Sequence, residues 1–519
     1  MKLRILLFYT AFVAMASIMA IVVDDARDIN TTHIAQKINA ENTVSSEGDV
    51  RATSCAINAR CPDCNIVLLS VDSLRADHVG AYGYERETTP YFDALAKKGV
   101  LFENYFSTSF LTPVSEMSVH TGMYPTAHKT TNFDTVLPED ITTLAQYFKQ
   151  KGYATSALLS SPEFEINPAL RKSFSRGFER YEYLEEVQRA FPTREQVEEE
   201  IDTFSDKKFF WWVGVGGVHW PYGAQGPNVF ADETYSGIFQ NKPLEWWSVF
   251  QNIYEGVQYP EQVSVEDADI QYVIDQYDNG VRAFDEFLER FMNELTRRNL
   301  LDRTIIIIQS EHGEDLHEHG YFAHYDILDT QTHVPLLVLF PRLDTECRIT
   351  SFAGSVDVFP TIVDVLGYPP LDQFQGTSLA PIIHGSEKDG ARQEVFLERS
   401  PLWEETFSIS ASLKNRGIET GSERHKDIGI RTPRWKYISR TSKQAMEKIQ
   451  WWRAVTGKKV QFPEEELYDL VSDPGEKKNV IGQYPDEAAA LRKKLQSWFE
   501  KISPPSQNTD TEPVIQPYF

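Results

Sequence analysis

The sequence predicts a doubly wound α/β fold with a smaller C-terminal α+β subdomain. Short apolar runs rich in branched residues are typical of strands buried on both faces of a parallel sheet. Such runs occur at residues 65–71, 154–159, 209–215, 304–308 and 334–340. Amphipathic helical patterns lie between them, at residues 91–98, 141–151 and 277–298. Strands that alternate with helices indicate a sheet whose ligands gather at the carboxyl ends of its strands.

The N-terminus has the pattern of an export signal. Lys2 and Arg4 precede an uncharged apolar stretch at residues 5–23. Its length fits either a cleaved signal peptide or a retained anchor, which would attach the protein to a membrane. Either one places the folded part outside the cytoplasm, in the periplasm or the extracellular space. The polar residues 24–63 are expected to form a lead-in to the globular part.

Length and charge limit the classes of partner. A chain of 519 residues that is 41% hydrophobic can bury a large core. It has 51 basic and 76 acidic side chains, and the net charge of −25 repels phosphate backbones. Nucleic acid is therefore not expected as a partner. An anionic substrate would need a metal ion or a local cationic pocket to hold it.

Four cysteines support export. Cys55, Cys61 and Cys64 precede the first strand, and Cys347 lies far along the chain. We expect disulfides, with the pairing left open. Half of a zinc site or a redox pair at Cys61 and Cys64 is the alternative, but no second pair supplies the other zinc ligands.

The remaining elements follow in order. Residues 223–270 contain many aromatics and predict an insertion over the active face or a packed surface flap. From residue 374 the pattern changes to shorter strands, at 428–439 and 466–470, and a closing helix at 487–499. We therefore expect a catalytic domain at 64–373, a C-terminal subdomain at 374–502 and a loose tail at 503–519.

Two predicted strands end in residues that bind metals. Asp72 follows the first strand, and Glu311 and His312 follow the strand that starts at Thr304. Two carboxylates and an imidazole at one edge of a sheet are three ligands for a divalent cation. Helix caps or surface salt bridges are the structural alternative for each of them taken alone.

A helix start lies between these strands in the chain. Pro113 suits the first helical position, which makes Thr112 the N-cap of a helix that runs to about Thr121 and Gly122. A hydroxyl there faces the positive end of the helix dipole and its free amides, where a phosphate or sulfate binds well.

Ordered motifs along the chain resemble the sulfatase family of the alkaline phosphatase superfamily. These motifs are Val71-Asp72-Ser73-Leu74-Arg75-Ala76-Asp77-His78, Thr121-Gly122-Met123-Tyr124-Pro125, His219-Trp220-Pro221-Tyr222, Ser310-Glu311-His312-Gly313-Glu314 and Asp357-Val358-Phe359-Pro360-Thr361. The resemblance extends over about residues 64–485 and implies an alkaline-phosphatase-like fold. It places Asp72, Glu311 and His312 on metal ligands, and Thr112 on the nucleophile, which also binds the metal.

Two positions depart from the family pattern. The family's sulfate-ester hydrolases have a Cys or Ser in a Cys/Ser-x-Pro-x-Arg motif, which is oxidised to formylglycine. This chain has Thr112, Val114 and Glu116 at the three defined positions, and threonine cannot be oxidised to formylglycine. Glu311 stands where the family usually has Asp, which a flexible oxygen-rich site tolerates.

Further candidates surround this set. The resemblance to threonine-dependent members implies that His324, with His219 as its companion, contacts substrate phosphate or binds a second metal; a buried structural histidine is the alternative. His128 and Arg75 are weaker candidates for substrate contact, and a salt bridge is favoured for Arg75.

Together these features predict an exported enzyme of phosphate or sulfate esters that forms a covalent ester on Thr112, with phosphoryl chemistry favoured. It would be a hydrolase or a phosphotransferase that uses one divalent cation or two, among Ca, Mg, Mn and Zn. The substrate would be an anionic ester of a small molecule, a glycan or a lipid head group. The alternatives are a sulfuric ester hydrolase that uses unmodified threonine and an inactive sulfatase-like binding protein.

Overall fold

The computed structural model describes most of the chain from Cys55 to Ser503. Residues outside the description are 1–54, 56, 58, 134, 162, 185–190, 205, 221, 224–226, 238, 240–265, 320–321, 325, 386–391, 400–426, 441–462 and 504–519. The predicted export signal, nearly all of the lead-in, most of the aromatic insertion and the tail after Ser503 therefore lie outside the described residues.

An eight-stranded sheet forms the centre of the molecule, in the order β10-β2-β9-β6-β1-β5-β3-β4. Strand β9 runs antiparallel to both of its neighbours, β2 and β6, and every other neighbouring pair is parallel. The strands are β1 (Asn65–Val71), β2 (Val100–Phe106), β3 (Ala154–Leu159), β4 (Arg180–Tyr183), β5 (Phe209–Val215), β6 (Thr304–Ser310), β9 (Leu336–Leu339) and β10 (Cys347–Gly354). This arrangement confirms the mostly parallel sheet that the sequence predicts.

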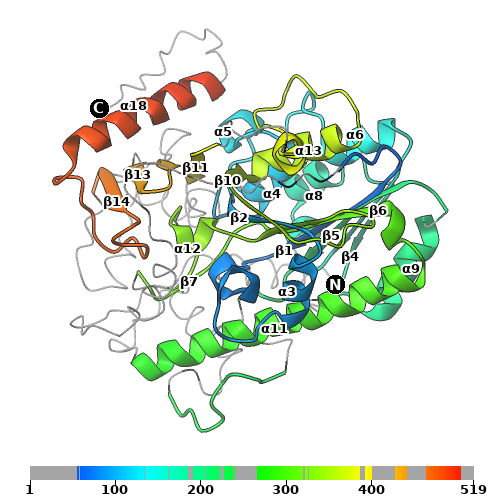
Figure 1. Cartoon of the computed structure of the whole chain (residues 1–519), viewed down its shortest axis with the longest axis horizontal. Helices are drawn as coiled ribbons and strands as arrows, with labels where there is room; N and C mark the ends of the chain where they lie inside the picture. Colours follow the sequence, from blue (N-terminus) through cyan, green and yellow to red (C-terminus); the bar gives the residue numbers. More distant parts are fainter. Residues whose placement is uncertain are drawn as a thin grey trace, which may run out of the picture.

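Helices cover both faces of this sheet, as the doubly wound prediction requires (Figure 1). One face packs against α3 (Pro90–Ala96), α9 (Arg194–Phe204) and the long α11 (Asp267–Arg297). The other packs against α4 (Thr112–Thr121), α6 (Leu144–Gln150), α8 (Pro168–Phe174) and α13 (Val358–Val365). Shorter helices are α5 (Pro125–His128), α7 (Glu163–Ile166), α12 (Asp329–Thr332) and α14 (Ala380–Ile383), and β7 (Asp315–Leu316) pairs with β8 (Phe322–Ala323).

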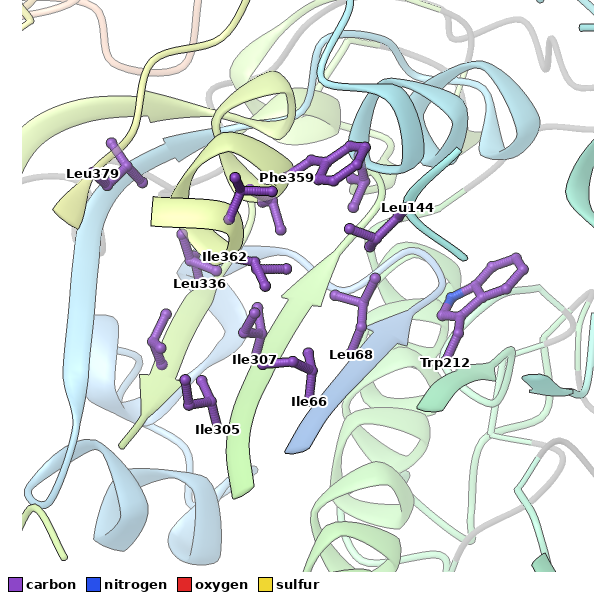
Figure 2. Close-up of a cluster of buried hydrophobic side chains, with 14 of the residues drawn as sticks. Ile66, Leu68, Leu144, Trp212, Ile305, Ile307, Leu336, Phe359, Ile362 and Leu379 are labelled. Atoms are coloured by element: carbon purple, nitrogen blue, oxygen red, sulfur yellow. The ribbon is translucent and has the colours of Figure 1, made fainter. Parts of the chain in front are cut away.

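The strand sequences explain why both faces are buried. Successive side chains of a strand point to opposite faces, so a run such as β1 must be apolar at every position to pack on both sides. Ile66 and Leu68 join the core beneath α13, whereas Val67 and Leu69 join the core against α11. Figure 2 shows the first of these cores, with Ile66 and Leu68 of β1 beside Ile305 and Ile307 of β6 and the side chains of α13 above them.

A second, antiparallel sheet follows in the C-terminal subdomain. It consists of β11 (Val395–Arg399), β12 (Asp427–Arg431), β13 (Trp435–Arg440) and β14 (Glu465–Asp469), and α18 (Pro485–Ile502) packs on it. The segment 428–439, predicted within a region of short strands and turns, contains two strands: a turn in which the Thr432 amide donates to the Trp435 carbonyl at 2.8 Å divides it into β12 and β13. The domain boundary at residue 374 stays a prediction.

All four cysteines form disulfides. Cys55 pairs with Cys347 across 292 positions of sequence, and Cys61 pairs with Cys64. Since the thiols are bound to one another, the zinc alternative at Cys61 and Cys64 is excluded. Disulfides persist in oxidising compartments, which agrees with export. Among the described residues, no helix is long and apolar enough to cross a membrane.

Candidate active site

The register of the central sheet brings Asp72 and Glu311 together. In the β1–β6 pair, Val71 lies opposite Ser310, so the residues that follow, Asp72 and Glu311, leave the sheet side by side. The Asp72 amide donates to the Val215 carbonyl at 2.9 Å, which holds this loop to the end of β5 as well. Three neighbouring strands therefore end at the same place, at the edge where a doubly wound fold binds ligands.

Asp72, Glu311 and His312 form a buried cluster in which the potential ligand atoms all lie within 4.8 Å of one another. Nε2 of His312 is 3.4 Å from Oδ1 of Asp72 and 3.9 Å from Oε1 of Glu311. Burial lowers the pKa of His312 to about 4, so the ring is neutral at pH 7. Its Nδ1 donates to the Gly313 carbonyl at 2.9 Å, which leaves the lone pair on Nε2. A lone pair facing two buried carboxylates is unfavourable without a cation, so the donor set fits a divalent metal.

Thr112 adds a hydroxyl to this cluster. Its Oγ1 lies 3.0 Å from Nε2 of His312, and the side chain is buried. The predicted N-cap role was wrong: Leu111 has the extended backbone of an N-cap (φ −106°, ψ 122°), and Thr112 is the first helical residue of α4. The hydroxyl is therefore turned toward His312, and no side chain caps this helix end. Pro113 has no N–H, and the Val114 and Ser115 amides donate to the Leu111 carbonyl at 2.9 Å.

Helix α4 is fixed against the loop that contains Glu311 and His312. All ten of its residues are buried. The Ser115 hydroxyl donates to the Glu311 carbonyl at 2.5 Å and lies 2.6 Å from the Ser107 hydroxyl. These contacts hold the N-terminus of α4, and with it Thr112, in a set position relative to Glu311.

A second cluster adjoins the first. His219, Glu314 and His324 place their potential ligand atoms within 4.8 Å of one another. Nε2 of His324 is 3.3 Å from Nε2 of His219, and the His324 ring centroid is 4.0 Å from that of His312. Burial raises the pKa of Glu314 to about 8. Glu314 was not predicted as a site residue, although it lies in the same motif as Glu311 and His312.

Two weaker candidates are structural residues. The buried Arg75 guanidinium pairs with Asp77 at 2.7 Å and with Glu318 at 2.6 Å, so the salt bridge favoured from the sequence is confirmed. His128 is fully buried: Nδ1 accepts from the Thr130 amide at 3.1 Å, and Nε2 lies 3.1 Å from the Ser118 hydroxyl. With both ring nitrogens bound inside the protein, the structure gives His128 a structural role and does not support its weak substrate-contact prediction.

Family comparison agrees with this geometry. The model of the family described as Sulfatase matches residues 64–368, and the model described as N-sulphoglucosamine sulphohydrolase, C-terminal, matches residues 317–503. The chain belongs to the sulfatase family. Among curated relatives, the ulvan-active sulfatase of Formosa agariphila is 23% identical over 86% of this chain and 76% of its own length. Arylsulfatase K of Gallus gallus is 23% identical over 87% of this chain and 85% of its own length.

Solved structures of the sulfatase fold superpose on most of the chain. The phosphonate monoester hydrolase of Agrobacterium radiobacter has a TM-score of 0.65 at 20% identity, with 85% of this chain and 96% of that chain covered. A structure in complex with its substrate D-glucosamine-2-N,6-O-disulfate has a TM-score of 0.61 at 19% identity, with 85% and 98% covered. These likenesses confirm the predicted alkaline-phosphatase-like fold.

Glu116 marks the departure from the sulfatase motif inside the site. The carboxylate is fully buried, and Nε2 of Gln309 donates to its Oε1 at 3.0 Å. Burial raises the pKa of Glu116 to about 7. Glu116 is therefore a further buried carboxyl group beside Glu311, at the position that the resemblance aligns with the arginine of the formylglycine motif.

Proposed function

We propose that this member of the sulfatase family is an exported, metal-dependent hydrolase or transferase of phosphate or sulfate esters that works through a covalent ester on Thr112. Phosphoryl chemistry is favoured. The observation that supports it best is the 3.0 Å contact between Oγ1 of Thr112 and Nε2 of His312, at the start of a buried helix and within the acidic cluster.

The identity of the nucleophile is the reason to favour phosphorus. A hydrated formylglycine releases sulfate by elimination, using its second hydroxyl group. A threonyl ester has no such second hydroxyl, so its release requires attack at the central atom. Phosphorus accepts that second attack more readily than sulfur does, which favours a phosphorylated Thr112.

Asp72, Glu311, His312 and the Thr112 hydroxyl would hold the cation. A divalent ion bound there would lower the pKa of the hydroxyl and neutralise charge on the oxygens of the reacting group. The Thr112 hydroxyl passes its proton to a water molecule, and Oγ1 bonds to phosphorus as the bond from phosphorus to the leaving oxygen breaks. The Thr112 amide, at the positive end of the α4 dipole, would donate to one of the remaining oxygens.

His219 and His324 lie where the substrate oxygens would be. Either can donate a proton to the leaving oxygen, which departs as an alcohol. Attack by water on phosphorus then restores the Thr112 hydroxyl and releases phosphate, whereas attack by an acceptor alcohol completes a transfer. The residues favour neither of these two outcomes over the other.

The substrate would be an anionic ester of a small molecule, a glycan or a lipid head group. A sulfuric ester is the second candidate, because several relatives of this chain are named as sulfatases. The charged start and apolar stretch of residues 1–23 support export, as a secreted or membrane-anchored protein. We also propose that residues 64–373 form the catalytic domain and 374–502 the subdomain that completes it.

Mass spectrometry of the full chain tests this proposal. The protein is incubated with an aryl phosphate monoester, an aryl phosphonate monoester or an aryl sulfate, each with Mg, Ca, Mn or Zn, and quenched in acid. A phosphoryl adduct on the peptide that contains Thr112 is the expected result. A sulfuryl adduct there would instead favour the sulfuric ester hydrolase. Turnover by Thr112→Ala at the wild-type rate would refute the covalent mechanism, and no turnover of any ester would favour the inactive binding protein.

A further inference from the structure

One face of the C-terminal sheet packs against the segment that follows His324. Side chains alternate along a strand, so Ile438 and Arg440 of β13 lie on the same face. Ile438 belongs to the same buried apolar cluster as Ile327. Gly429 of β12, opposite Ile438, leaves room for this packing, since a Cβ there would lie 3.0 Å from Cδ1 of Ile327. The other face of the sheet packs on α18.

Arg440 binds this segment through a carboxylate. Its Nη1 and Nη2 donate to Oδ1 and Oδ2 of Asp326 at 3.0 and 2.9 Å, so both carboxylate oxygens are held. Nε and Nη2 also donate to Oε2 of Glu466 at 2.9 and 2.6 Å, and Nη1 donates to Oδ2 of Asp427 at 3.4 Å. These five contacts use all the donors of the buried guanidinium. Arg440 therefore keeps no donor for a substrate.

The segment is held at its other end as well. Nζ of Lys436, which is fully buried, donates to Oδ1 of Asp329 at 2.8 Å. Nη2 of Arg431 donates to Oδ2 of the same carboxylate at 3.1 Å. Lys436 and Arg431 lie opposite each other on β13 and β12. The carboxylates of Asp326 and Asp329 therefore attach residues 326–329 to the C-terminal sheet at two points.

A second link runs from Arg440 to the loop before Thr112. Asp427, which accepts from Arg440, also accepts from Nη1 of Arg399 at 3.1 Å. The Arg399 guanidinium lies 6.0 Å from the ring centroid of Phe110, within the range of a cation–π contact. Phe110 is two positions before Thr112. The C-terminal sheet therefore contacts the chain on both sides of the proposed site.

We propose that Arg440 is a positioning residue, which fixes His324 relative to Thr112 from outside the site. Asp326 is two positions after His324, so displacement of this carboxylate would move the histidine. Replacement of a residue that supports a functional side chain commonly changes activity by about 10–100-fold. The effect on turnover rests on the proposed function, whereas the attachment of residues 326–329 to the sheet does not.

Replacement of Asp326 by asparagine tests this inference with little change in volume. The amide cannot accept from both ends of the guanidinium, while Arg440 keeps Asp427 and Glu466 as partners. Hydrogen–deuterium exchange at residues 322–328 should become faster by about tenfold, because one end of the segment is released. With the best ester, kcat should fall by about 10–100-fold and KM should change by less than about threefold.

A second variant and a matched control accompany it. Arg440→Lys keeps the positive charge without the paired donors, and should cause the same changes in exchange and kcat as Asp326→Asn. The control is Glu465→Gln: Glu465 accepts from Nε and Nη2 of Arg492 on α18, at 2.6 and 2.5 Å. This paired contact lies on the side of α18, so exchange at residues 322–328 and kcat should both stay within about threefold of the wild type.

Each other outcome would overturn the inference. Unchanged exchange at residues 322–328 in both Asp326→Asn and Arg440→Lys, or an equal effect of Glu465→Gln, would refute the attachment. Faster exchange with wild-type kcat, or with a change in KM alone, would refute the positioning role. A wild type that turns over no ester and forms no adduct on Thr112 would instead refute the proposed function, and the positioning role with it.

Discussion

Replacement of Thr112 by valine separates the chemistry of the site from its stability. Valine has nearly the shape of threonine, so the buried volume is kept while Oγ1 is lost. The substitution removes the 3.0 Å contact with His312 and leaves the ring nitrogen without that donor. Loss of a buried hydrogen bond in this way costs about 1–3 kcal/mol of unfolding free energy.

The expected loss of activity is larger. Removal of an enzyme's nucleophile commonly lowers kcat by a factor of at least about 10³, which corresponds to about 4 kcal/mol in the barrier. The Thr112→Val variant should therefore fold, melt a few degrees below the wild type and lose at least about 10³-fold in turnover of its best ester. Thermal melting and steady-state kinetics on one preparation measure both quantities.

Thr121→Val is the matched control. Thr121 is the last residue of the same helix, is fully buried, and its hydroxyl donates to the Met117 carbonyl at 2.7 Å. Its replacement should cost a similar free energy of unfolding and leave turnover within about threefold of the wild type. The reasoning is refuted if Thr112→Val keeps more than about a tenth of the wild-type turnover, or if both variants lose activity equally.

Three further predictions concern metal, acid and disulfides. Removal of divalent metal by a chelator should abolish turnover and lower the melting temperature, and return of metal should restore both; full turnover after chelation would contradict this. Burial lowers the pKa of His120 from 6.5 to about 3. Between these two pH values the ring is neutral in the folded protein and binds a proton in the unfolded chain. The contribution of neutral His120 to the free energy of unfolding is complete above pH 6.5. It falls by about 1.4 kcal/mol per pH unit from pH 6.5 down to pH 3. Urea unfolding at pH 7 and pH 5 should show a smaller difference in His120→Phe than in the wild type, and an equal difference would argue against this origin. Replacement of Cys55 and Cys347 by serine should cost about 2–5 kcal/mol, because their disulfide closes a long loop. The double serine variant at Cys61 and Cys64 should lose less in the same denaturation assay, since that loop is short, and an equal loss would contradict the loop-length argument.

Burial explains which strands could be predicted. β1, β3 and β5 have the predicted bounds because strands buried on both faces are continuous apolar runs. The edge strands β4 and β10 and the interior strand β2 were not predicted. β4 has no fully buried residue, and β10 includes half-buried positions such as Arg348 and Thr350. β2 is interrupted by the half-buried Glu103 and Asn104, so each of the three missed strands lacks a continuous apolar run.

A site residue could be predicted from the sequence when the signal for its role lies in neighbouring positions of the chain. Asp72, Glu311 and His312 could be proposed because they directly follow recognisable strands, and the helix start could be located from Pro113. The salt bridge of Arg75 could also be favoured, since Asp77 lies two residues away, whereas the internal partners of His128 were not predicted.

The amino-acid sequence determined the fold class, the strand ends that face the site and the family, because apolar periodicity and local motifs are properties of neighbouring residues. Tertiary structure alone decided the pairing of Val71 with Ser310, which sets Asp72 beside Glu311. It also decided the burial of Glu314 between two histidines. Register and burial depend on contacts between segments hundreds of residues apart, which no local pattern records.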